Sequence, residues 1–288
     1  GTSPSAVAVF TTTWCTVSHH GPNTCGFYMS LFVANAGSDT VSAYLIDQST
    51  GVPHPSFPAS YATGTGPSAM AVGTYAPNTP YLYVANSGSN DISAFGIDGS
   101  SGGLRPVVGS PFPSNGNVSS LAFGAGDVFV YPPGTSNGTR NYRGLLYAAN
   151  ASGDTASITG FSIYPAIGGA KEGALTALPG FPYDLPSCSY IVADQTGAYL
   201  YATAGTNVFG FSIDPQTGAL SPLPGSPIAI GDTADSVSID PTNQFLYVTN
   251  HSAGRVTGFK LNAATGELTP MPGSPFAVSQ PADFVATF

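Results

Sequence analysis

The chain has 288 residues, a net charge of −9 and charged side chains at only 7% of its positions. Six lysine and arginine residues cannot form a basic surface that neutralises many phosphates, so we expect no nucleic-acid partner. No apolar run reaches the roughly 18 residues that a membrane-spanning helix needs, so we expect no membrane insertion.

The first expected strand is "PSAVAVF", from Pro4, and a polar loop with two cysteines follows it. This loop, "CTVSHHGPNTC", runs from Cys15 to Cys25. A local disulfide between the two, formed in an oxidising compartment, is the favoured interpretation. The alternative is a metal site of Cys15, His19, His20 and Cys25, but adjacent histidines in so short a loop fit the usual spacing of structural zinc poorly.

A five-residue phrase then recurs along the chain. It reads LFVAN from Leu31, LYVAN from Leu82, LYAAN from Leu146, LYATA from Leu200 and LYVTN from Leu246. Each copy has similar neighbours in the same order, so the repeating unit is a whole supersecondary element. Its period lies in the range of propeller blades.

The fifth repeat shows the grammar of one unit most clearly. Residues 234–240 alternate as a half-buried strand, and residues 245–250 are almost continuously apolar, as in a strand buried on both faces. Residues 255–262 form a third expected strand. Residues 267–278 form a proline-rich outer strand, since proline is tolerated at a sheet edge. The repeat therefore predicts four antiparallel strands.

The fold class that follows is all-β, a β-propeller of four-stranded antiparallel blades. We expect one domain, 1–288, because blades that share a closed core count as one unit. Five full repeats are visible, together with one surplus innermost strand. The expected blades are 1–62, 63–114, 115–183, 184–230 and 231–278, and the extra strand is 281–288.

The surplus strand unbalances the two ends of the array. It includes Pro281, Asp283, Phe284 and Phe288. Either the natural chain carries further blades, or this strand pairs elsewhere, as an unpaired strand is a template for another chain. An intersubunit strand would make the expected partner a second copy, in a homo-oligomer or filament, or another surface protein.

The motifs resemble the YVTN β-propeller repeats, which overlap the lactonase-type seven-bladed propellers related to bacterial 6-phosphogluconolactonase. The residues that carry the likeness are the Leu-Tyr-Val-Ala/Thr-Asn strands and the runs "FSIDPQTGALSPLPGSP" (211–227) and "LNAATGELTPMPGSPF" (261–276). The resemblance covers nearly the whole chain apart from residues 11–29 and 125–144. It implies a lactone hydrolase with His, Glu and Arg at the mouth of the central channel.

The chain offers no obvious set of such residues. Glu172 and Glu267 fall at the starts of outer strands, and Arg105 lies in an outer strand. His54 and His251 are isolated. We therefore assign no catalytic, cofactor or metal residue from the sequence. Asp47, Asp98 and Asp214 end the third strands and are interpreted as turn formers.

Two other residue types bear on location and burial. Cys188 is expected to be a small buried hydrophobe. The best exposed of four glycosylation sequons is at Asn137, the others being headed by Asn117, Asn150 and Asn250.

These observations favour a non-catalytic propeller, secreted or at the cell surface, that acts as a structural scaffold and self-assembles through its surplus strand. An enzyme is the less favoured interpretation. The alternatives are a hydrolase of a sugar or aliphatic lactone, and a propeller that binds a ligand with the loops at 11–29 and 125–144.

Overall fold

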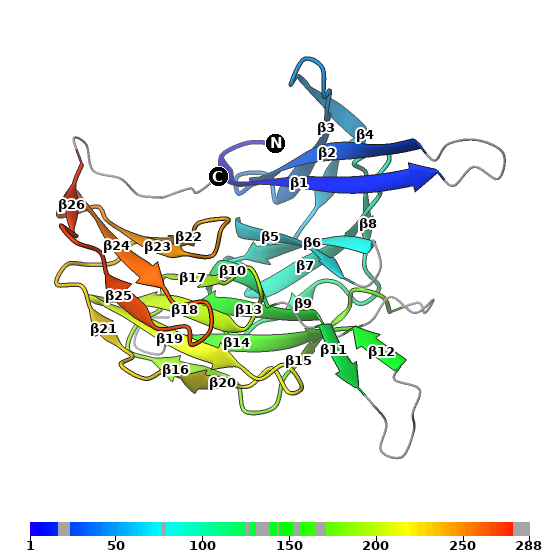
Figure 1. The fold of residues 1–288 in the computed structure, drawn as a ribbon. Coiled ribbons are helices and arrows are strands. Elements are labelled where there is room, and N and C mark those ends of the chain that lie inside the picture. Colours follow the sequence, from blue (N-terminus) through cyan, green and yellow to red (C-terminus); the bar gives the residue numbers. More distant parts are fainter. Residues whose placement is uncertain are drawn as a thin grey trace. The chain divides into compact units, whose positions relative to one another are not determined.

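The computed structural model describes residues 1–16, 24–75, 79–124, 127–130, 139–142, 144–151, 156–164 and 171–278. All regular structure in these residues is β-strand (Figure 1). No helix in the described ranges is long and apolar enough to cross a bilayer. The prediction of an all-β fold is confirmed.

The strands are grouped in two compact units. One comprises residues 1–114 and 164–174, the other residues 115–163 and 175–288. The first unit contains two sheets. One has β1 (Pro4–Thr16), β2 (Thr24–Asn35), β3 (Thr40–Ile46) and β4 (Pro53–Ala62). The other has β5 (Pro67–Tyr75), β6 (Thr79–Asn86), β7 (Asp91–Ile97), β8 (Leu104–Pro106) and β9 (Phe112–Pro113).

The second unit contains three sheets of the same kind and a short hairpin. The first sheet has β10 (Val118–Gly124), β13 (Gly144–Asn150), β14 (Ala156–Ile163), β15 (Leu175–Ala177) and β16 (Tyr183–Leu185). The next has β17 (Tyr190–Ala193), β18 (Tyr199–Ala204), β19 (Asn207–Ile213), β20 (Leu220–Pro222) and β21 (Ile228–Ala229). The last has β22 (Ser236–Ile239), β23 (Phe245–Asn250), β24 (Arg255–Leu261), β25 (Leu268–Pro270) and β26 (Phe276–Ala277). The hairpin is β11 (Asp127–Val130) with β12 (Thr139–Tyr142).

Every sheet is an antiparallel meander, so each corresponds to one propeller blade as the repeat predicts. The innermost strands pack side by side within each unit, β1 against β5 and β10 against β17 against β22. The recurring phrase forms the second strand, which is covered on both faces, and all seven residues of β13 are buried. This explains the sparse charge, because an ionised side chain between two sheets would lose its hydration.

The outer strand differs from the continuous segment expected at 267–278. In four sheets it divides into two short strands, such as β25 and β26, around a Pro-Gly turn. At the break in three of these sheets, a serine hydroxyl accepts the N–H that the missing ladder would have paired; the sheet with β15 and β16 has Phe181 at this position. Ser110, Ser226 and Ser274 do so for Ala94, Gly210 and Gly258, at 2.8–2.9 Å. In these three sheets the turn therefore interrupts the strand without leaving that N–H unpaired.

The asparagine that ends the recurring phrase is buried and links the second strand of the blade to the third. Asn86, Asn150 and Asn250 are 0% exposed. In Asn86 and Asn150 the amide donates to hydroxyls on the third strand, such as Ser93 and Thr159. The sequons headed by Asn150 and Asn250 are thus closed to glycosylation in the folded chain, whereas Asn137 lies outside the described residues.

Candidate functional site

A cavity of about 280 Å³ opens on the sheet β5–β8, inside the first unit. Three polar side chains line it, those of Tyr81, Arg105 and Glu172. The rest of the wall is formed by Gly96, Pro106, Val107 and Val108. A concave site with a few convergent polar groups in an apolar wall is the usual form of a small-molecule site.

Three cavity residues lie opposite one another on neighbouring strands. Tyr81 on β6 pairs with Gly96 on β7, and Gly96 pairs with Arg105 on β8. A Cβ at Gly96 would lie 3.7 Å from the Arg105 Nη2 and 3.8 Å from the Tyr81 Cε1. The missing side chain at Gly96 therefore leaves the space between phenol and guanidinium open.

Tyr81 is the buried member of the site. Its side chain is 1% exposed, and its hydroxyl has no hydrogen-bond partner among the described residues. Burial, reinforced by the negative charge of Glu172 and opposed by Arg105, raises the pKa of Tyr81 to about 12. At neutral pH the phenol is thus protonated and is a hydrogen-bond donor.

Glu172 and Arg105 differ in exposure. Arg105 is exposed on the short outer strand β8, and Glu172 is half-buried in the turn that precedes β15. Glu172 belongs to the first unit, together with the rest of residues 164–174. The strand that follows it, β15, belongs to the second unit. The cavity therefore combines a cation, a base and a neutral donor.

The cavity residues depart from the chain's own repeat. Arg105 stands where the three sheets of the second unit have a hydroxyl residue opposite the third strand, namely Thr176, Ser221 and Thr269, and where the first sheet has His54. Glu172 precedes a positive-φ glycine where the other turns have Thr50, Ser101, Thr217 and Thr265. Gly96 replaces Leu45, Ser162, Ser212 and Lys260.

The sequence analysis names no convergent set of acid and base residues, whereas the structure places Arg105 and Glu172 on the wall of one cavity. Both do begin outer segments, but they belong to different repeats that meet within one unit. A comparison of the repeats with one another could have found them, because both replace a small hydroxyl residue with a charged one. Glu267 does not line this cavity, and His54 lies exposed on β4.

The aspartates at the ends of third strands are confirmed as turn formers. The Oδ1 of Asp47 accepts the N–H groups of Ser49 and Thr50, both at 2.9 Å. These bonds, led by the Ser49 hydroxyl, lower the pKa of Asp47 to about 2. Asp98 and Asp214 accept equivalent bonds, and hydrogen bonds lower their pKa values too.

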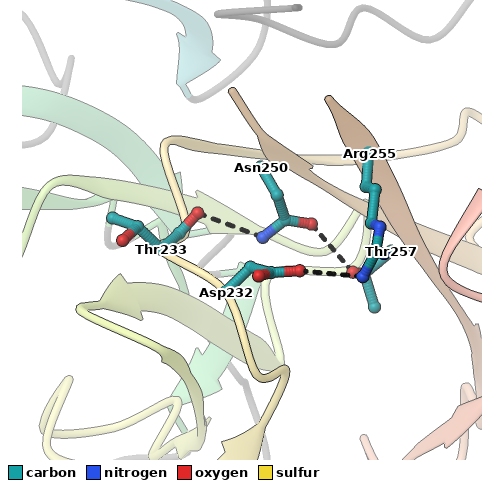
Figure 2. A network of polar contacts seen from close by, with 5 residues as sticks. All are labelled: Asp232, Thr233, Asn250, Arg255 and Thr257. Atoms are coloured by element: carbon teal, nitrogen blue, oxygen red, sulfur yellow. Dashed lines mark hydrogen bonds and ion pairs between the residues drawn. The ribbon is translucent and has the colours of Figure 1, made fainter. Parts of the chain in front are cut away.

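A second polar cluster joins the loop before β22 to the hairpin β23–β24 (Figure 2). The amide of Asn250 donates to the Thr233 carbonyl at 3.1 Å, and the Thr257 hydroxyl donates to the Asn250 Oδ1 at 2.9 Å. Arg255 forms an ion pair with Asp232 at 3.4 Å, and the two side chains are 50% and 30% exposed. The polar groups of this cluster are paired with one another, so we interpret it as a set of contacts that holds the loop before β22 against the hairpin, not as a reaction centre.

The remaining predicted residues fall at or beyond the described part. The backbone register sets Cys15 directly opposite Cys25 on β1 and β2, and their disulfide stays a prediction. Cys188 is buried, as expected. His19, His20, Asn137 and the terminal residues Pro281, Asp283, Phe284 and Phe288 lie outside the described residues. Within those residues, no group of three or more His, Cys, Asp or Glu side chains could hold a metal ion.

Comparison with known proteins gives a family match over part of the chain and a shared fold. Residues 146–271 match the family model "Lactonase, 7-bladed beta-propeller". No curated protein matches the chain.

Solved structures share the architecture. A candidate 6-phosphogluconolactonase from Bacteroides uniformis aligns with a TM-score of 0.62 at 14% identity, over 88% of this chain and 69% of that one. A second, from Bacteroides fragilis, aligns with a TM-score of 0.62 at 19% identity, over 88% and 68%. Hydrazine synthase from Kuenenia stuttgartiensis aligns with a TM-score of 0.51 at 17% identity, over 85% and 63%. Likeness at such identities shows the fold.

The expectation of a non-catalytic scaffold is corrected by these findings. The sequence match is to a lactonase family, so the comparisons favour the lactonase alternative over the scaffold. One support of the scaffold interpretation, beside the low charge, the expected disulfide and the surplus strand, was the absence of a polar catalytic set, and the cavity weakens that support. The chain thus has a β-propeller fold, and its residues 146–271 are similar to the lactonase-type seven-bladed propellers.

Proposed function

We propose that this protein hydrolyses a lactone, and that the reaction takes place in the cavity of Tyr81, Arg105 and Glu172. The family match supports the class of reaction. The observation that carries the site is the convergence of three groups in one cavity of about 280 Å³: a carboxylate, a guanidinium and a buried phenol that has no hydrogen-bond partner among the described residues. That volume suits a small cyclic ester rather than a polymer.

The chemistry assigns one role to each polar group. Glu172, as general base, takes a proton from a water molecule whose oxygen attacks the lactone carbonyl carbon. Negative charge then develops on the carbonyl oxygen, where the phenol of Tyr81 donates a hydrogen bond and Arg105 supplies positive charge. The ring C–O bond breaks, the alkoxide takes the proton from Glu172, and the product is an open-chain hydroxy acid.

Turnover of a panel of sugar and aliphatic lactones, followed by acid release in a pH-stat, tests the proposal. In Glu172→Gln, kcat should fall by about 10²–10⁴-fold, the range typical of a lost general base. Glu267→Gln is the matched control, because Glu267 is the other glutamate of the chain and does not line the cavity. Undiminished turnover in Glu172→Gln would refute this site, and no turnover of any lactone by the wild-type protein would refute the activity.

A further inference from the structure

The turn that carries Glu172 is held from two sides at the next residue, Gly173. The hydroxyl of Tyr83, on β6, donates to the Gly173 carbonyl at 2.8 Å, and this bond is buried. Gly173 has a φ of +80°, and a Cβ there would lie 2.3 Å from the Cε1 of Tyr81. One tyrosine therefore binds the backbone beside Glu172, while the other allows no side chain at Gly173.

The same bond recurs in the second unit. Tyr147 donates to the Gly218 carbonyl at 2.8 Å, and Tyr201 donates to the Gly266 carbonyl at 2.6 Å. In each case the tyrosine of one repeat holds the positive-φ glycine of the next repeat's turn. A hydrogen bond from a second-strand tyrosine to a turn glycine of the next repeat thus recurs three times.

What differs at Tyr83 is the residue that the fastening holds. Thr217 and Thr265 precede the glycines of the other turns, and their hydroxyls accept N–H groups within the same turns. Glu172 takes that position in the turn held by Tyr83, and it lines the cavity. In this turn a carboxylate that lines the cavity takes the place of a hydroxyl that caps the turn. The residue after it is held by the bond from Tyr83.

We infer that Tyr83 is a positioning residue, whose bond to Gly173 sets the distance of the Glu172 carboxylate from Tyr81 and Arg105. This inference rests on the proposed function for its kinetic consequence, but not for its structural one. A general base acts only within hydrogen-bond reach of its proton, and a displacement of about 1 Å can cost about 10²-fold in rate. Tyr83 contacts no reacting atom in this scheme.

The variant that removes the bond is Tyr83→Phe. The corresponding residue of the first repeat is Phe32, which is 0% exposed, so phenylalanine suits this position in the fold. Tyr201→Phe is the matched control, because it removes the equivalent bond beside Glu267. Both variants should lose similar thermal stability.

Carboxyl-carbon NMR of protein labelled with 13C-glutamate reads the position of the two glutamates directly, since Glu172 and Glu267 are the only ones in the chain. We expect Tyr83→Phe to shift the Glu172 carboxyl signal while leaving the Glu267 signal unchanged, and Tyr201→Phe to do the reverse. An unchanged Glu172 signal in Tyr83→Phe would overturn the inference. Because this result needs no turnover, it stands apart from the fate of the proposed function.

The kinetics of the same two variants give a second test of the inference. In Tyr83→Phe, kcat should fall by about 10- to 100-fold with KM nearly unchanged, as expected when a base is displaced but the cavity is intact. Tyr201→Phe should keep the wild-type kcat. An equal loss of kcat in both variants would show a merely structural bond and would also overturn the inference.

Discussion

Tyr81 and Tyr199 occupy the same position in two repeats, one before the buried leucine of the recurring phrase, yet their hydroxyls differ. The Tyr199 hydroxyl donates to the Ala264 carbonyl at 2.7 Å. The Tyr81 hydroxyl is buried and has no partner among the described residues. The same repeat position therefore carries a hydrogen-bonded hydroxyl in Tyr199 and, in Tyr81, a hydroxyl without a partner among the described residues, on a side chain that lines the cavity.

Substituting the two tyrosines should therefore have opposite consequences. Tyr199→Phe loses a hydrogen bond and should lower the free energy of unfolding by about 1 kcal/mol. Tyr81→Phe removes an unpaired buried polar atom and should leave stability unchanged or raise it, while kcat for lactone hydrolysis falls by about 10²-fold. Urea unfolding and pH-stat rates check both. Equal destabilisation by the two substitutions would mean that the Tyr81 hydroxyl has a partner after all.

Filling the cavity should separate activity from stability. Gly96→Leu restores the residue type of the first repeat, Leu45, and a Cβ at Gly96 meets its neighbours only at ordinary contact distances. We expect a gain of about 1 kcal/mol in unfolding free energy, as for other cavity-filling changes. The same substitution should lower kcat/KM at least about tenfold, because the guest loses its space between Tyr81 and Arg105. Normal kinetics in a stable Gly96→Leu protein would place the reaction elsewhere.

The sequence predicted the blades well because their signal is repeated. The phrase at Leu31, Leu82 and Leu246 marks the second strand each time, so weak local patterns reinforce one another. The candidate site carries the opposite signal. Arg105 and Glu172 matter because they break the repeat, and they come from different repeats. Their convergence depends on a long turn held within the first unit, which no local pattern specifies.

The break in the outer strand was also hidden from the sequence. The run "PGSP" indicates a turn and an edge, but not that the serine hydroxyl replaces a ladder acceptor for the third strand. Ser226→Ala would leave the buried Gly210 N–H unpaired, at a cost of about 1–3 kcal/mol in unfolding free energy. Ser221→Ala, at an exposed position on β20, is the control and should stay within about 0.5 kcal/mol of wild type. Equal values for the two variants would contradict the role of the hydroxyl.

The register of β1 and β2 supports the predicted disulfide. Cys15 and Cys25 are directly opposite, and facing residues on antiparallel strands have Cβ atoms about 4.5–5.5 Å apart, close to the spacing that a disulfide needs. In protein produced under oxidising conditions, peptide mass spectrometry should find the two joined and Cys188 as a free thiol. A free thiol at Cys15 would contradict the prediction.

Alkaline pH should unfold this protein through its buried phenols. Burial, the largest cause, raises the pKa values of Tyr81, Tyr147, Tyr190 and Tyr201 above the ordinary 10.0, with Tyr81 at about 12. A phenol whose pKa is higher in the folded state than in the unfolded chain favours folding fully below pH 10, and this contribution is lost as pH rises through the folded value. The free energy of unfolding should therefore be flat from about pH 8 to 10 and decline toward pH 12.

Urea unfolding at each pH measures this free energy, with absorbance of ionised tyrosine near 295 nm as the parallel signal. Tyr147→Phe should decline less steeply than wild type, and an identical slope would show that this phenol is not involved.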